Sequence, residues 1–174
     1  MLIISDDQFA DAELSYLEEL LVLIDKSLTE TNARINKADT WEVETWCDKG
    51  EYLIGTGFCL MQRYLFSTLT DTKLDPKTAR QLGPKTKRAV PIAELIHSAA
   101  NYWKHSPEWH IWLQILEKRS QRTIDSTLHG RDSADYPLSC LLADFCEDKE
   151  FSLVNCLPYL TEWRHAVLEY MANL

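Results

Sequence analysis

The sequence has few residues that interrupt a helix, since only five of its 174 residues are glycine and six are proline. Runs of β-branched residues are also scarce, and no segment shows the alternation of polar and apolar residues that is typical of a strand. Apolar residues recur instead every three or four positions along most of the chain. This pattern predicts an all-α fold.

The cysteines show neither the number nor the spacing of a disulfide framework or a zinc ribbon. There are five of them, an odd number, and no two form a Cys-x-x-Cys pair. We therefore expect reduced thiols in the core and no metal site. His105 and His110 also make a poor zinc pair, because Ser106 and Pro107 interrupt the helix between them.

Long apolar runs and glycine-rich loops are absent as well. No stretch approaches the roughly 18 uncharged apolar residues of a membrane span, and the first residues lack the basic opening of a signal peptide. We therefore expect a cytoplasmic protein with no membrane contact. The glycine patterns of phosphate loops and dinucleotide-binding turns are missing too, which predicts no nucleotide cofactor.

The periodicity and the helix breakers predict a single domain, residues 1–174, built as an up-and-down bundle of about four long helices plus short ones. Ser5 is a suitable N-cap for the first helix, and Pro91 suits the first position of another. The three glycines of the second helix, Gly50, Gly55 and Gly57, indicate a kink or a close helix contact. The predicted helices cover about 6–35, 39–70, 76–82, 91–105, 107–130, 137–146 and 158–174.

Charge is distributed unevenly along the chain. The net charge is −9, which disfavours a general affinity for nucleic acid. Residues 73–88 nevertheless contain six basic side chains and one acidic side chain, and a second basic run holds Lys118, Arg119, Arg122 and Arg131. Each run is compatible with a local anion site or with a solvated segment.

A polar stripe lies on the predicted helix 91–105. Its members, separated by three or four residues and so on one helix face, are Glu94, His97, Asn101 and His105. Such a stripe could be the solvated side of the helix. It could also line a cleft, where a histidine can move protons and an asparagine can hold a substrate oxygen.

The end of this stripe resembles a motif of the HEPN superfamily, the higher-eukaryote and prokaryote nucleotide-binding group of helical proteins. Many members carry Arg-Asn-x-x-x-His near the start of a late helix. Asn101, the spacer 102–104 and His105 match the last five positions of that pattern. The resemblance covers this short motif and an all-helical context of compatible length.

The resemblance implies metal-independent RNA cleavage by a bacterial stress, toxin-antitoxin or phage-defence protein. His105 would then be the general acid-base group and Asn101 an orienting group, with His97 and Glu94 as further members of the site. The resemblance also implies a homodimer, because the motifs of such proteins usually face one another across a two-fold axis.

This sequence departs from the motif at its first position, where Ala100 replaces the arginine that would hold the scissile phosphate. Two interpretations remain open. The chain could bind RNA without cutting it, or neighbouring basic residues could supply the missing charge. The candidates for this substrate-binding role are Lys87, Arg88 and Lys104.

A hypothesis from a different class is a non-catalytic interaction domain. The predicted first helix carries a wide apolar stripe between acidic residues, which could pack against a second copy or a small protein partner. His129, next to Gly130, is predicted to have a structural role at a helix terminus.

Overall fold

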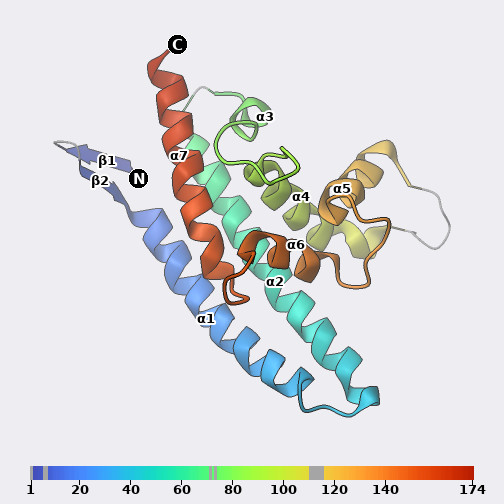
Figure 1. Cartoon of the computed structure of the whole chain (residues 1–174). Coiled ribbons are helices and arrows are strands. Elements are labelled where there is room, and N and C mark those ends of the chain that lie inside the picture. The colour runs from blue at the N-terminus through green and yellow to red at the C-terminus, as the bar shows by residue number, and fades with distance from the viewer. Residues whose placement is uncertain (1, 6–7, 71, 73, 110–115) are drawn as a thin grey trace.

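The computed structural model describes residues 2–5, 8–70, 72, 74–109 and 116–174 (Figure 1). The all-α prediction is confirmed, since long helices packed against one another form the body of the molecule. The helices are α1 (Ala12–Ile35), α2 (Thr40–Thr70), α3 (Pro76–Ala79), α4 (Ile92–His105), α5 (Lys118–Leu128), α6 (Pro137–Cys146) and α7 (Leu157–Ala172). Two 3-10 turns, η1 (Ser106–Glu108) and η3 (Leu153–Cys156), complete the described helical elements.

The N-terminal segment differs from its prediction. Residues Leu2–Ser5 (β1) and Gln8–Asp11 (β2) pair as an antiparallel hairpin, so the helix predicted from residue 6 begins only at Ala12. Ile3 and Ile4 are β-branched, which favours extended backbone. Asp11 then caps α1 in place of Ser5, because its side chain accepts a hydrogen bond from the Leu14 amide at 3.0 Å.

The helices α1, α2, α4 and α5 alternate in direction. The start of α1 contacts the end of α2, and the end of α4 borders the same cavity as the start of α5. Along α2, Gly55 meets Trp103 and the later Phe66 meets the earlier His97, so α2 and α4 are antiparallel. α5 therefore lies on the opposite side of α2 from α1 (Figure 1). α6 packs on α2, α7 contacts α2 through Arg164 and Tyr64, and α4 and α5 lie side by side.

Two of the three glycines of α2 mark close contacts, one of the two alternatives predicted, whereas Gly50 has only ordinary contacts at 4.0 Å. A Cβ on Gly55 would lie 2.3 Å from the ring of Trp103, and one on Gly57 would lie 2.6 Å from Leu153. Trp103 therefore packs α4 tightly onto α2, and it meets Tyr52 edge to face at 4.8 Å between ring centroids.

The prediction of one long helix from 107 to about 130 is wrong, as the described residues of this segment show. The chain leaves α4 through η1, Trp109 adopts an extended conformation, and α5 begins only at Lys118. Pro107 and Ser106 thus form a 3-10 turn and not a new α-helix. His110, considered above for a zinc site, and residues 111–115 of the predicted helix lie outside the described residues.

All five cysteines are free thiols, as predicted, with Cys146 and Cys156 buried and the others partly buried. Burial raises the pKa of the Cys156 thiol well above its usual value. None of the described helices is long and apolar enough to cross a membrane.

Candidate functional site

The polar stripe of α4 borders two neighbouring cavities between α4 and α5. The larger, about 740 Å³, is lined among others by Asn101 and His105 of α4 and by Arg119 of α5. The smaller, about 430 Å³, is lined by Glu94, His97, Ser98 and Asn101 of α4 and by Arg80, Arg119, Arg122, Thr123, Asp125 and Ser126. Asn101, Arg119 and Thr123 border both cavities. The stripe therefore faces a groove. Of the two alternatives left open by the sequence, a solvated helix side or the wall of a cleft, the structure has the second.

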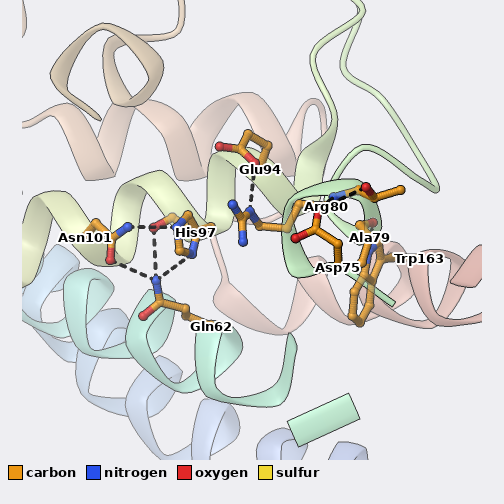
Figure 2. A network of polar contacts seen from close by, with 9 residues as sticks. Gln62, Asp75, Ala79, Arg80, Glu94, His97, Asn101 and Trp163 are labelled. Carbon is orange, nitrogen blue, oxygen red and sulfur yellow. Dashed lines mark hydrogen bonds and ion pairs between the residues drawn. The ribbon is translucent and has the colours of Figure 1, made fainter. Parts of the chain in front are cut away.

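A buried glutamine of α2 organises the centre of the stripe. The Gln62 amide nitrogen lies 2.9 Å from Nδ1 of His97 and donates to the Asn101 side-chain oxygen at 3.1 Å. The Asn101 amide nitrogen lies 3.0 Å from Nε2 of His97, which closes a triangle of three side chains (Figure 2). Gln62 is only 5% exposed, so this triangle is fixed to the core on one side and borders the groove on the other.

Lys104 sets the orientation of the Gln62 amide. Its Nζ donates to the Gln62 carbonyl oxygen at 2.6 Å, so the amide nitrogen of Gln62 must point toward His97. Side-chain amide nitrogens therefore face both ring nitrogens of His97. A protonated imidazole donates at both nitrogens and would find an acceptor at neither, whereas a neutral ring can accept from one of them. The arrangement favours the neutral ring.

Electrostatics act in the same direction on His97. Burial of the ring lowers the pKa of His97 to about 4, and the positive charge of Arg80 adds to the effect, while Glu94 opposes it. His97 is consequently uncharged at neutral pH. It can orient Asn101 and accept a hydrogen bond at one ring nitrogen, but it lacks the second proton that a general acid would donate.

This depressed pKa predicts a loss of stability in mild acid. Between about pH 6.5 and pH 4 the unfolded chain binds a proton at His97 and the folded chain does not, so the free energy of unfolding falls as the pH falls through that window. The full shift corresponds to roughly 3 kcal/mol, and solvent screening of a partly exposed ring reduces our expectation to about 2 kcal/mol.

Urea unfolding at pH 7 and pH 4.5 measures the loss, and His97→Gln, which has no titrating group, is the control. We expect the variant to lose about 2 kcal/mol less than the wild type between the two pH values. Equal losses in the two proteins would show that His97 titrates normally.

Glu94 lies farther along the stripe and forms an ion pair. Nε of Arg80, the residue that ends α3, donates to its carboxylate at 2.8 Å, with the side chains 14% and 30% exposed (Figure 2). Asp75 caps α3 by accepting from the Thr78 amide at 2.9 Å, and this cap fixes the turn that carries Arg80. Glu94 therefore holds a guanidinium at the wall of the smaller cavity.

His105, at the far end of α4, is in a different environment. Its side chain is 49% exposed and Nδ1 lies 3.4 Å from a carboxylate oxygen of Glu108. It belongs to no buried network in the described part of the chain. Of the two stripe histidines, His105 is thus the one whose ring solvent or a ligand in the groove can reach.

The three predicted substrate-binding residues are not brought together at the groove. Arg88 donates to the His129 carbonyl at 2.6 Å, and Lys87 pairs with Glu147 at 3.2 Å on the surface. Lys104 donates to Gln62 from behind the stripe. None of the three is among the residues that line the two cavities.

The basic residues that do line the groove are Arg80, Arg119 and Arg122. The sequence shows Arg80 within the basic segment and the other two within the second basic run, but nothing in either run indicates that they meet α4. Gln62 gave no signal in the sequence, because it is one of many polar residues in a long helix. Its role depends on the antiparallel packing of α2 and α4.

A second histidine cluster holds the loop between α3 and α4. His129 ends α5 with a φ of 49°, as its predicted terminal role requires, and only 8% of it is exposed. Its Nδ1 lies 3.0 Å from Asp144 and its Nε2 lies 3.1 Å from the Thr86 hydroxyl. Although this order resembles a hydroxyl-imidazole-carboxylate relay, both carboxylate oxygens of Asp144 already accept from Arg131, at 2.7 and 2.8 Å. The cluster is therefore best explained as an anchor for the loop.

No group of three or more histidine, cysteine or acidic residues within the described ranges is placed to hold a metal ion. Comparisons with family models, curated proteins and solved structures found no match to the chain.

Proposed function

We propose that the chain binds RNA in the groove between α4 and α5 and cleaves it there without a metal ion. One observation carries the proposal: Asn101, His105 and Arg119, from two different helices, border the same cavity of about 740 Å³. An amide, an imidazole and a guanidinium are the groups needed to orient, deprotonate and neutralise a phosphodiester.

The environment of Ala100 supports a role for Arg119 in place of the motif arginine. Ala100 is fully buried, and its carbonyl oxygen lies 3.8 Å from the Cys59 thiol on α2. A guanidinium at this position would enter the core without a partner, at a high cost in free energy. The groove instead has a guanidinium on its opposite wall, where α5 carries Arg119.

In the proposed reaction the His105 imidazole takes the proton of a ribose 2′-hydroxyl as that oxygen attacks the adjacent phosphorus. The bond from phosphorus to the 5′-oxygen then breaks, and the leaving oxygen takes a proton from water or from the imidazolium. Arg119 would stabilise the charge that develops on the phosphoryl oxygens. Asn101, held by Gln62 and His97, would orient the strand.

RNA binding tests the proposal directly. We expect a single-stranded oligonucleotide to bind the wild type at low salt, and Arg119→Ala to weaken binding about tenfold or more, since a charge-assisted contact contributes about 1.5–3 kcal/mol. Fluorescence anisotropy over a range of salt concentrations measures both the affinity and the salt slope.

Lys118→Ala is the matched control, because it removes the same charge from the neighbouring position of α5 but Lys118 lines neither cavity. Its affinity should stay within about twofold of the wild type. Absence of RNA binding by the wild type at low salt would refute the proposed function.

A second candidate, a self-associating interaction domain, is favoured by an exposed apolar stripe on α1. Tyr16, Leu20 and Leu23 lie within two turns of one helix face and are 63%, 44% and 64% exposed. Isolated apolar side chains on a surface are ordinary, but a stripe along one face is typical of a helix that packs on a partner.

For this candidate we predict a homodimer whose dissociation constant rises roughly thirtyfold in Leu23→Glu, the effect of losing a contact of about 2 kcal/mol. Val22→Glu is the control, because Val22 is 51% exposed on a different face of α1. Light scattering across a dilution series measures the equilibrium. A wild type that stays monomeric at high micromolar concentration, or equal effects of both substitutions, would argue against association through this stripe.

A further inference from the structure

The smaller cavity between α4 and α5 has an unusual set of available donors. Ser98 borders the cavity and is only 5% exposed, yet its hydroxyl has no hydrogen-bond partner among the residues that the structure describes. The hydroxyl oxygen itself is not sealed from solvent, so it can donate to a ligand in the cavity. The hydroxyl lies on α4, opposite the arginines of α5.

Two guanidiniums of this cavity are also without an ion pair in the described part of the chain. Arg119 and Arg122 lie one turn apart on α5 and both border the cavity. Both carboxylates of the cavity are already engaged: Glu94 accepts from Arg80, and Asp125 accepts from the Gln121 amide at 2.8 Å. The Gln121 amide is neutral and leaves the charge of Asp125 in place, so the charged residues that line the cavity have a net charge of +1. The cavity thus offers two guanidiniums without an ion pair and a hydroxyl as donors.

We propose that this smaller cavity binds the terminal phosphate monoester of an RNA strand, with Arg119, Arg122 and the Ser98 hydroxyl as its donors. The inference rests on the proposed function and names the form of RNA that the groove prefers. A monoester carries about −1.5 to −2 charges at neutral pH, whereas a phosphodiester within the strand carries one. A monoester also has three terminal oxygens, which can accept from the two guanidiniums and the Ser98 hydroxyl together.

The position of the cavity agrees with a strand end. It shares Asn101, Arg119 and Thr123 with the larger cavity, which also contains His105 and Trp109. A strand whose terminal phosphate occupies the smaller cavity would therefore place its first nucleotide in the larger one. His97 borders the smaller cavity as a neutral ring, so the positive charge there comes from the arginines.

Three internally labelled RNA oligonucleotides of one sequence test the proposal: one with a 5′-phosphate, one with a 3′-phosphate and one with hydroxyls at both ends. We expect one phosphorylated form to bind the wild type at least tenfold more tightly than the unphosphorylated strand. Arg122→Ala should abolish this preference, so that the three strands bind the variant with equal affinity, because Arg122 lines only the smaller cavity. Ser98→Ala should reduce the preference about threefold, and Lys118→Ala should preserve it.

Equal binding of the three strands by the wild type, or an equal loss for all three in Arg122→Ala, would overturn the terminal-phosphate site while leaving RNA binding intact. Calorimetric titration with inorganic phosphate tests the anion site without RNA, and so distinguishes failure of this site from failure of RNA binding. If no RNA binds but phosphate binds the wild type and not Arg122→Ala, the anion site stands and the proposed function fails. If neither phosphate nor any strand binds, both are refuted.

Discussion

Replacing Arg164 with methionine should destabilise the protein by about 3–5 kcal/mol, a large fraction of the total stability of a domain of this size. Arg164 of α7 forms a salt bridge with Asp11, and each side chain is only 6% exposed. Its guanidinium also donates to the Tyr64 hydroxyl at 3.1 Å, and that hydroxyl donates to Asp11 at 2.6 Å. Removing the arginine would leave a buried carboxylate without its counterion.

Urea unfolding measures this effect, with Lys149→Met as the control for loss of an exposed positive charge. The double variant Asp11→Asn with Arg164→Met should recover part of the loss, with a coupling of about 1–3 kcal/mol, because asparagine keeps the α1 cap without the buried charge. Destabilisation below about 1 kcal/mol in Arg164→Met would show that water solvates the carboxylate and that the pair is not an essential contact.

The helical content of the chain could be predicted because it depends on local signals. The apolar period predicted the helices, and Pro76, Pro91 and Pro137 marked starts that the structure places within one residue. The close contact at Gly55 followed from a residue type that lacks a side chain. Each of these signals lies within the element that it predicts.

Contacts between distant segments could not be predicted in this way. The carboxylate of Asp25 on α1 accepts from the amides of Leu153 and Val154 at the start of η3, at 2.8 and 3.0 Å. Glu51 on α2 caps α6 in the same manner, through the Leu138 and Ser139 amides. Both acids look like ordinary surface charges in the sequence. Their partners are about 90 residues or more away, so only the packed bundle reveals them.

The pKa of Glu51 also depends on contacts with a distant segment. Burial raises the pKa of its carboxyl, and the hydrogen bonds from Ser139 and Leu138 oppose that shift. Neither effect can be inferred from the neighbours of Glu51 in the sequence. A cap supplied by another helix therefore fixes how α6 sits on α2, in addition to satisfying its first amides.

The candidate site was predictable only in part for a related reason. The spacing of Glu94, His97, Asn101 and His105 fixed one wall of the groove, because residues of one helix share a face by geometry alone. The opposite wall depends on α5, whose start the sequence placed about ten residues too early. The basic residues nearest in sequence, Lys87 and Arg88, were therefore assigned to a role that Arg119 is better placed to fill.

Replacing His105 with alanine should abolish RNA cleavage without unfolding the protein. A general acid-base group contributes about 10²- to 10⁴-fold to the rate, so we expect the rate constant to fall by that factor if His105 has this role. The side chain is half exposed and its contact with Glu108 is long, at 3.4 Å, so the free energy of unfolding should change by no more than about 0.5 kcal/mol.

The measurement pairs single-turnover cleavage of a labelled RNA with urea unfolding of the same preparations. His165→Ala is the control, since it removes an exposed histidine from α7 that lines neither groove cavity. Affinity for the uncleaved strand should be nearly unchanged in His105→Ala, because Arg119 and Asn101 remain. Cleavage at the wild-type rate by His105→Ala would refute the acid-base role. A wild type that binds RNA and leaves it intact would instead identify a binding protein, in which the groove positions a strand and His105 has no reaction to catalyse.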